Sequence, residues 1–383
     1  MSGRLEARPA IETCLAIETS CDDTSVAVVR RDGRVLSMAS ASQDSVHGPF
    51  GGVVPEIASR NHTLHLMPLV DRALAASGLG WAGIDGLAVT NAPGLLGSLL
   101  VGVVAAKALA MALEKPFIGV NHLEGHLLAP FLRDDAYSPP TDFGYPFIAL
   151  AVSGGHTSLY RVEGLGDYDV IGRTVDDAAG EAFDKFAKMA GLGFPGGPLV
   201  DACAVHGDSA RFAFPRAMLR EPHFNFSFSG LKAAAGREFA TLSAVDRERL
   251  EREAEHVVEG LGPSRGLAPG LLADLCASFQ AAVVDVLLER LVRAVRTEGL
   301  ARAVLTGGVS ANSGLRARAA AWATGAGVEL IVPPLRYCTD NAAMIGYAGI
   351  LRLNRGERSA QDLGPSPRAP LGRCRPSAIG PRP

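Results

Sequence analysis

Apolar runs separated by polar turns predict two similar three-stranded meanders in this chain. Residues 14–29 form an apolar strand, a polar turn (Glu-Thr-Ser-Cys-Asp-Asp) and a second apolar strand, and a third strand follows an Asp32-Gly33 turn. Residues 147–162 repeat this layout, with Thr-Ser again opening the second strand. The third strand of this second meander is expected at residues 168–171. The repetition indicates an internal duplication.

The segments that follow the two meanders also resemble each other. Residues 86–94 (Gly-Leu-Ala-Val-Thr-Asn-Ala-Pro-Gly) precede an apolar helical stretch, and residues 303–314 (Ala-Val-Leu-Thr-Gly-Gly-Val-Ser-Ala-Asn-Ser-Gly) also lead into a helix. Meanders followed by α/β crossovers describe the duplicated ribonuclease-H-like fold of actin, sugar kinases and Hsp70. This is an α/β class with two lobes and a ligand cleft between them. In it, tight polar turns point backbone N–H groups at phosphates.

The expected lobes follow from this pattern. The first actin-like lobe spans residues 13–145, and a final helix at about 340–355 is expected to return to it. The second actin-like lobe spans residues 146–339. Within it, a charged stretch followed by a Gly/Pro-rich run predicts a surface insertion at about residues 241–270.

Three further segments complete the expected organisation. Residues 1–12 carry no periodic pattern and residues 356–383 are rich in Pro and Arg, so both are predicted to be disordered tails. Residues 95–113 are almost wholly apolar. Because they follow one predicted strand and precede another, we expect a buried crossover helix there and not a membrane span.

Composition limits the cellular compartments and the binding partners that can be expected for this chain. The chain has 383 residues, 48% of them hydrophobic, which is enough for two lobes with their own cores. Its net charge of −3 means that a nucleic acid would be held by a local patch or by a surface shared with a partner. The six cysteines form no Cys-x-x-Cys pair, and without a signal peptide the chain is expected to be reduced and cytoplasmic.

Two histidines at helical spacing predict a metal site. His122 and His126 follow the apolar strand 116–120, and residues i and i+4 share one helix face, so both rings can reach one ion. Zinc proteases have a Glu directly after the first His, whereas the Glu here is at position 124. Asp340 offers a third ligand, and two His plus a carboxylate suit Fe(II), with Zn(II) as the alternative. A polar helix start without metal, and a helix cap at Asp340, are the plain structural alternatives.

Nine motifs follow one another along the chain. They are Glu18–Thr24, His47–Arg60, Asn121–His126, Val152–Thr157, Asp176–Lys185, Phe194–Pro198, Phe226–Lys232, Gly307–Asn312 and Cys338–Asn341. In this order the chain resembles the bacterial TsaD family, over about residues 14–355. The resemblance implies a tRNA N6-adenosine threonylcarbamoyltransferase. Such an enzyme moves the threonylcarbamoyl group of threonylcarbamoyl-AMP to N6 of the adenosine 3′ of the anticodon, in tRNAs that read codons beginning with A.

The resemblance also implies partners and site residues. The partners are tRNA, threonylcarbamoyl-AMP, a paralogous actin-like subunit that forms a heterodimer, and a small P-loop ATPase, with no membrane. One Fe(2+), alternatively Zn(2+), would be bound by His122, His126 and Asp340. Asp22 would orient the attack or assist proton removal. The adenylate would be held by Ala151, Val152, Ser153, Gly154, Gly155, Asp184, Gly197, Asp201 and Asn312.

Each of these assignments has a structural alternative in the sequence itself. Asp22 could close an Asx turn, and residues 153–155 could form a plain hairpin turn. Asp184 and Asp201 could lie on a solvated helix face or cap a helix, and Asn312 could be a helix cap. At the level of function, the alternatives are a sugar kinase on the same fold, a metalloprotease, and a non-enzymatic scaffold subunit. Archaeal and eukaryotic relatives carry a Tyr ligand where this chain has Ala151, so a more open metal coordination is expected.

Overall fold

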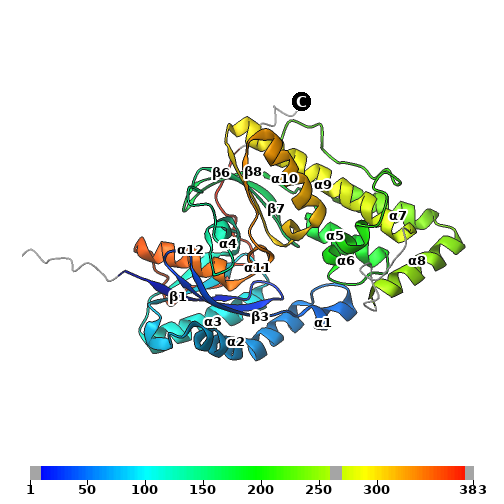
Figure 1. Cartoon of the computed structure of the whole chain (residues 1–383). Helices are drawn as coiled ribbons and strands as arrows, with labels where there is room; N and C mark the ends of the chain where they lie inside the picture. The colour runs from blue at the N-terminus through cyan, green and yellow to red at the C-terminus, as the bar shows by residue number, and fades with distance from the viewer. Residues whose placement is uncertain (1–9, 259–269, 376–383) are drawn as a thin grey trace, which may run out of the picture. The chain divides into compact units, whose positions relative to one another are not determined.

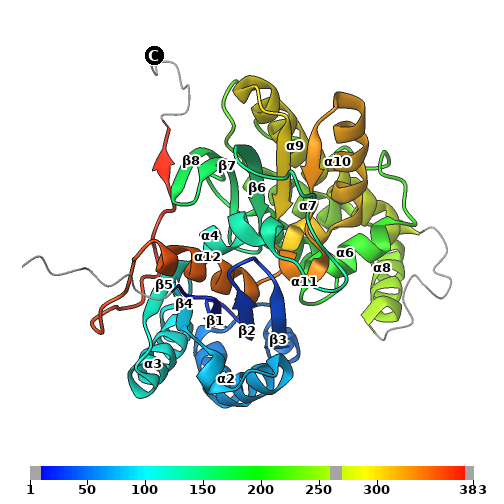
Figure 2. The same cartoon turned by 60° about the vertical axis from the view of Figure 1, so that its left-hand side comes forward.

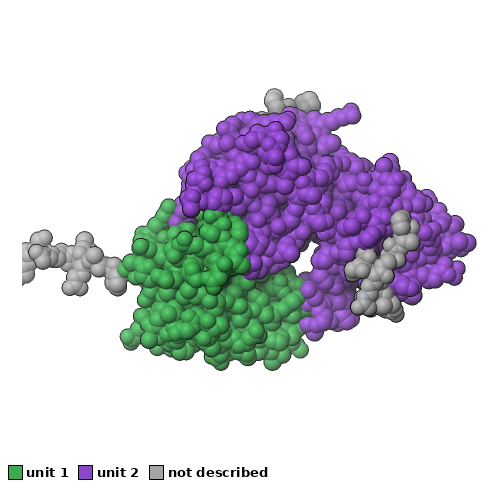
Figure 3. Space-filling view, viewed as in Figure 1, with its two compact units in different colours: residues 1–43, 55–139, 340–370 green, residues 44–54, 140–339, 371–383 purple. Residues whose placement is uncertain are grey.

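The computed structural model describes residues 10–258 and 270–375, which are drawn in colour in Figure 1. The chain divides into two compact units (Figure 3). Unit 1 takes residues 1–43, 55–139 and 340–370, and unit 2 takes residues 44–54, 140–339 and 371–383. The final helix therefore belongs to unit 1, although about 200 residues of unit 2 precede it.

Among the described residues, unit 1 has a five-stranded sheet of order β3-β2-β1-β4-β5. The first three strands form the expected antiparallel meander, and β4 and β5 continue the sheet in parallel with β1. The strands are β1 (Thr13–Glu18), β2 (Thr24–Arg30), β3 (Val35–Ala41), β4 (Gly86–Ala92) and β5 (Phe117–Asn121).

Helices cover both faces of this sheet (Figure 2). They are α2 (Pro55–Ser77), η2 (Trp81–Gly83), α3 (Leu96–Leu113), α4 (His122–Leu128), η3 (Ala129–Phe131) and α12 (Ala342–Asn354). Successive residues of a strand point to opposite faces. Leu15 and Ile17 therefore join the cluster that packs against α2 and α3, whereas Ala16 faces α12.

The described part of unit 2 has a six-stranded sheet of order β10-β9-β6-β7-β8-β11. Its strands are β6 (Phe147–Val152), β7 (Thr157–Gly164), β8 (Asp167–Arg173), β9 (Arg302–Thr306), β10 (Glu329–Ile331) and β11 (Arg373–Cys374). An antiparallel β6-β7-β8 meander is continued in parallel by β9 and β10, which is the arrangement of β1-β2-β3 with β4 and β5. The predicted duplication and its fold class are confirmed.

The helices of unit 2 surround a long central helix, α9 (Leu271–Glu298), which is almost entirely buried. The remaining elements are α1 (Asp44–His47), η1 (Gly48–Phe50), α5 (Ala179–Met189), α6 (Gly196–Ala204), α7 (Ser229–Thr241), α8 (Ala244–His256), η6 (Gly308–Ala311), α10 (Ser313–Ala326) and α11 (Leu335–Cys338). The charged stretch of the expected insertion forms α8, which buries Leu250 and Ala254. Residues 259–269 of that insertion lie outside the described part.

By length and composition, two helices of the described residues could cross a membrane, α3 and α9. The most apolar window of α9 is 89% buried, as in the core helix of a globular unit. The corresponding window of α3 is only 33% buried. The expectation of a crossover helix at this place is confirmed, because α3 connects the parallel strands β4 and β5. The expectation that it is buried is wrong for its outer face, where apolar side chains remain exposed.

The prediction of a disordered tail from residue 356 is wrong for residues 356–375. Side-chain donors of unit 1 bind carbonyl groups of this segment, with 3.0 Å from Lys107 Nζ to Leu363 O and 3.1 Å from Asn121 Nδ2 to Ala369 O. Further on, β11 pairs with β8. A Pro-rich segment lacks the periodicity of a helix or strand, but its carbonyls still accept hydrogen bonds, so composition alone does not reveal this order. The predicted N-terminal tail of residues 1–12 is also wrong at its end, because Ile11 is buried and its N donates to Asn354 Oδ1 at 3.0 Å. Residues 1–9 and 376–383 of the two predicted tails lie outside the described residues.

The close contact between α12 and the sheet at Gly349 predicts that a larger residue there would destabilise the protein. A Cβ added to Gly349 would lie 2.4 Å from the Cβ of Ala88. We expect Gly349→Ala to lower the free energy of unfolding by about 1–3 kcal/mol in urea denaturation, because the helix must move off the sheet. Gly325→Ala in α10 is the control, since no atom lies within 4 Å of its added Cβ. It should raise stability by up to about 1 kcal/mol through helix propensity. Equal effects of the two variants would contradict the packing argument.

Candidate metal centre and ligand-binding loops

The three predicted metal ligands meet in unit 1. Helix α4 begins directly after β5 and is capped by Asn121, whose Oδ1 accepts a hydrogen bond from Leu123 N. His122 and His126 lie on one face of α4, with ring centroids 4.7 Å apart. Asp340 lies just before α12, but the residue that caps this helix is Asn341. The alternative that Asp340 is the helix cap is therefore wrong.

The separations within this triad fit ligands of a single ion. Asp340 Oδ1 lies 3.3 Å from His122 Nε2 and 3.1 Å from His126 Nε2, and one ligand atom from each residue falls within 4.8 Å of the others. Neighbouring ligands bound at about 2.1 Å are separated by about 3.0–3.4 Å around one ion. Two imidazole nitrogens and a carboxylate oxygen are donors that suit Fe(II) or Zn(II). Both imidazoles are buried, and Asp340 retains some exposure to solvent.

Charge pairing sets the protonation of these groups. Burial alone would raise the pKa of Asp340, but the two imidazoles hold it well below its usual range. Burial would lower the pKa of His122, but the carboxylates of Asp340 and Glu18 raise it well above its usual value. For His126 burial prevails, and its pKa is lowered. Asp340 Oδ1 thus bridges the two imidazoles, and binding of a metal ion would require both imidazole nitrogens that face it to be free of protons.

A buried ion pair ties the two ligand-bearing helices together. Glu124 of α4 is fully buried and forms a bidentate pair with Arg352 of α12, with N–O distances of 2.7 and 2.8 Å. Gly125 allows the close approach, because a Cβ there would lie 2.8 Å from Ile345 Cδ1. In the sequence, Glu124 stands out only because it is not at the position of a protease base. Its pairing with a residue 228 positions away could not be found from the local pattern.

The turn that carries Asp22 is fixed by a buried histidine. His62 of α2 donates from Nε2 to Cys21 O at 2.9 Å and accepts at Nδ1 from Thr24 Oγ1 at 2.7 Å. Burial lowers the pKa of His62, which keeps this ring neutral. The pKa of the Cys21 thiol is raised by burial first and then by the charges of Asp22 and Asp340. The Asp22 turn therefore lies within electrostatic reach of the metal ligands.

All nine predicted adenylate-binding residues lie in unit 2. Five of them form the end of β6 and the turn to β7, namely Ala151, Val152, Ser153, Gly154 and Gly155. The first two are buried, and the two glycines are exposed with open space beside them. The carbonyls of Ser153 and Gly154 accept from Gly180 N (3.3 Å) and Glu181 N (3.1 Å) at the start of α5. This turn is therefore a hairpin turn held against a helix N-terminus.

The other four residues are joined through α6 and α10. Asp184 Oδ1 accepts from Gly196 N at 2.8 Å, which brings it to the first turn of α6, where Gly197 lies. Asp201, further along α6, accepts from Asn312 Nδ2 at 3.1 Å. Asn312 Oδ1 caps α10 by accepting from Leu315 N.

A residue not identified from the sequence, Gln280 of α9, completes this cluster. Its Oε1 accepts from Asn312 Nδ2 at 2.7 Å, and it is buried. The amide nitrogen of Asn312 thus donates to two partners, Asp201 and Gln280, within the protein. The Asp201 carboxylate is engaged as well, because it also accepts from Ser313 N at 2.9 Å and from Ser313 Oγ at 2.8 Å at the start of α10. A buried glutamine in the middle of a long apolar helix is the signal that could have suggested this cluster.

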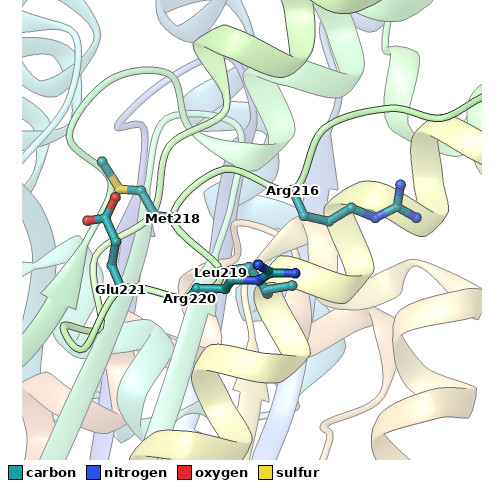
Figure 4. Close-up of a pocket in the computed structure, with 5 residues that line it drawn as sticks. All are labelled: Arg216, Met218, Leu219, Arg220 and Glu221. Atoms are coloured by element: carbon teal, nitrogen blue, oxygen red, sulfur yellow. The ribbon is translucent and has the colours of Figure 1, made fainter.

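A surface cavity of about 370 Å³ lies elsewhere in unit 2, lined by Arg216, Met218, Leu219, Arg220 and Glu221 (Figure 4). None of the predicted site residues lines it. Arg290, fully buried, donates to backbone carbonyls of this loop, among them Glu221 O at 2.9 Å. Arg293 donates to Leu219 O at 2.7 Å. Hydrogen bonds from these two arginines hold the loop in place. The cavity is not part of the predicted metal or adenylate sites.

The Glu124–Arg352 pair predicts a large stability effect from one substitution. Arg352→Met removes the bidentate partner of the buried Glu124 carboxylate, which should lower the free energy of unfolding by about 3–5 kcal/mol in urea denaturation. Arg31→Met is the control in the same unit, because Arg31 pairs with Glu12 at the surface. Its effect should stay below about 1 kcal/mol. Similar losses in the two variants would show that burial of Glu124 does not matter.

Comparisons with known proteins agree with the motif order. Residues 34–347 match the family model described as TsaD, tRNA N6-adenosine threonylcarbamoyltransferase. A protein of that name from Bdellovibrio bacteriovorus is 58% identical over 94% of this chain and 98% of its own length. Another from Sorangium cellulosum is 51% identical over 94% of this chain and 97% of its own length.

A solved structure of full-length HypF in a phosphate- and nucleotide-bound form is similar in fold. It matches with a TM-score of 0.52 and 12% identity, over 91% of this chain and 56% of that chain. This identity supports a likeness of fold alone. The sequence matches, by contrast, cover nearly the whole chain at half or more identical residues. The chain belongs to the TsaD family of tRNA N6-adenosine threonylcarbamoyltransferases.

Proposed function

We propose that this chain transfers the threonylcarbamoyl group of threonylcarbamoyl-AMP to N6 of the adenosine 3′ of the anticodon. The substrates are tRNAs that read codons beginning with A, and the products are N6-threonylcarbamoyladenosine and AMP. The observation that carries this proposal is the convergence of His122, His126 and Asp340 in a chain that matches this family over residues 34–347. A sugar kinase on the same fold has no need of this triad.

A metalloprotease is disfavoured by the position of Glu124. A protease glutamate must reach a metal-bound water as a general base. Glu124 is instead fully buried and occupied by Arg352. A neutralised, solvent-free carboxylate cannot exchange protons with a substrate.

We propose one Fe(2+) at the triad, with Zn(2+) as the alternative, and the same residues would hold either ion. When bound, the metal would act as a Lewis acid that organises the phosphate or the threonyl carboxylate of the adenylate. The ligand rings are held by hydrogen bonds and by the α4–α12 ion pair, so they are preorganised for binding.

For the adenylate we propose residues 151–155, Asp184, Gly197, Asp201 and Asn312. Exposed Gly154 and Gly155 leave the turn backbone open to a phosphate or carboxylate, and Gly197 also has open space beside it. The carboxylate of Asp201 can accept from ribose hydroxyls or an amine. Asn312, engaged by its neighbours, would then act mainly by orienting Asp201.

In the transfer step, the adenine amine attacks the carbamoyl carbon, the bond to the adenylate oxygen breaks, and AMP leaves with that oxygen. A weakly nucleophilic amine depends on positioning against the activated group. The amine loses one proton in this step. We propose that Asp22 orients the amine or accepts this proton, and the rigid turn held by His62 supports such a role.

The test is to incubate the purified protein with partners, threonylcarbamoyl-AMP and unmodified tRNA, and to read digested nucleosides by mass spectrometry. Wild type should form N6-threonylcarbamoyladenosine, and His122→Ala/His126→Ala should lose at least about 100-fold in rate through loss of the metal. His65→Ala, an exposed histidine on α2, is the matched control and should retain activity. Asp22→Ala should bind substrates normally but turn over more slowly.

Two results would contradict the proposal. Absence of product with wild type, while the adenylate is intact and the partners are bound, would favour a scaffold or kinase. Full activity of the double histidine variant would remove the metal from the mechanism.

We also propose a heterodimer with the paralogous actin-like subunit, joined by a small P-loop ATPase, in the cytoplasm. Exposed apolar side chains on the adjacent helices α2 and α3, here called the α2/α3 face, support it; they are Leu64, Met67, Leu96, Leu100, Val104 and Met111. Such a patch is typical of a protein interface. The net charge of −3 fits a tRNA surface shared with partners. The six unpaired thiols suit a reducing compartment.

Charges on the α2/α3 face should prevent this association. We expect Leu100→Glu/Val104→Glu to weaken binding of the paralogue by at least about 100-fold in isothermal titration calorimetry, because a burial-driven contact would have to desolvate two carboxylates. Val205→Glu/Val245→Glu is the control, since these valines lie in unit 2 and are even more exposed than Leu100 and Val104. Unchanged binding by the first variant, with its fold intact, would place the interface elsewhere.

A further inference from the structure

We propose that Glu18 is a positioning residue for the metal ligand His122, holding its Nδ1–H so that Nε2 faces Asp340 as the ligand atom. This inference rests on the metal site of the proposed function. It adds a carboxylate that does not itself touch the ion but fixes the orientation and the tautomer of one ligand.

The sheet topology brings the relevant groups together. Strands β1, β4 and β5 are parallel neighbours, so their carboxyl ends lie side by side. Glu18 is the last residue of β1, Thr90 lies near the end of β4, and His122 follows β5 directly. Three adjacent strand ends thus each supply one group.

The hydrogen bonds form a chain from β4 to the metal triad. Thr90 Oγ1 donates to Glu18 Oε2 at 2.6 Å, and His122 Nδ1 lies 3.0 Å from the same oxygen. The other carboxylate oxygen accepts from Ser20 N at 2.5 Å. On the far side of the ring, Nε2 lies 3.3 Å from Asp340 Oδ1. Each imidazole nitrogen of His122 therefore has its own carboxylate.

The burial of Glu18 shows that this arrangement is specific. The residue is fully buried, and a carboxylate in a sheet core costs several kcal/mol unless donors surround it. A strand end inside an apolar sheet has no packing need for such a group. Pairing a metal-bound imidazole with a carboxylate fixes the tautomer and increases the basicity of the ligand.

The second histidine lacks this support. Among the described residues, His126 Nδ1 has no hydrogen-bond partner. Ser20 Oγ lies 3.2 Å from His122 Nδ1 and so shares the same nitrogen with Glu18. The Glu18 carboxylate therefore orients only one of the two imidazoles. Its removal should change the orientation of His122 without disturbing His126, which distinguishes this effect from a disorder of the whole site.

The test measures metal binding itself. Zn²⁺ affinity is determined by competition with a chromophoric chelator, and the visible spectrum of the Co²⁺-loaded protein reports the ligand geometry. We expect Glu18→Gln to weaken Zn²⁺ binding by about 10–100-fold and to alter the Co²⁺ spectrum. Glutamine has nearly the same shape but presents an amide where the carboxylate accepted two hydrogen bonds.

Two further variants separate positioning from folding. Thr90→Val keeps the shape of the side chain and removes the donor to Glu18, so it should weaken Zn²⁺ binding several-fold even if Glu18→Gln does not fold. Ser37→Ala removes a buried hydrogen bond to Ala73 O in the same unit. It should lower the midpoint of urea denaturation and leave the affinity and the spectrum unchanged.

The outcomes for this inference and for the proposed function can be told apart. Wild-type affinity and spectrum in both Glu18→Gln and Thr90→Val, with wild-type protein that binds Zn²⁺, would overturn the role of Glu18 alone. Failure of the wild-type protein to bind any metal would instead overturn the metal site on which both depend.

Discussion

The close packing of α12 is the constraint on which the candidate metal centre depends. A Cβ at Gly346 would lie 2.9 Å from Val29 Cγ2, and one at Gly349 would lie 2.4 Å from the Ala88 Cβ, so the helix rests directly on the sheet. Asp340 immediately precedes this helix, while both histidines lie on α4. A displacement of α12 by the width of one methyl group would move the carboxylate out of reach of the imidazoles.

Buried carboxylates then fix the short helix α4 within this frame. A seven-residue helix has little stability by itself, so its orientation comes from tertiary contacts. Glu124 binds Arg352 on α12, and Glu18 binds the first histidine from the end of β1. Buried ion pairs contribute little net stability because desolvation opposes them. Here they select one position of α4, in which both imidazoles lie 3.1–3.3 Å from Asp340 Oδ1.

In unit 2, side chains predicted to bind a ligand also hold the fold. Asp184 binds the first turn of α6, and Asn312 caps α10 while it donates to Asp201. Cap and ligand contact are compatible for a carboxylate, because each oxygen can accept more than one hydrogen bond. The amide nitrogen of Asn312 already donates to Asp201 and Gln280, which uses both of its N–H groups. The proposed site thus combines exposed backbone at Gly154 and Gly155 with side chains whose positions are set by helix ends.

The sequence by itself determined the duplication and the two meanders, since alternation is a local property, and i,i+4 spacing together with motif order predicted that His122, His126 and Asp340 would meet. It did not determine the path of residues 356–375, because carbonyl groups accept hydrogen bonds whatever the composition. Nor could it pair Glu124 with Arg352, Glu18 with His122, or Gln280 with Asn312. Such pairs join segments far apart in the chain. Only the tertiary structure decides them, because strand order and helix packing, and not sequence distance, set which buried polar groups meet.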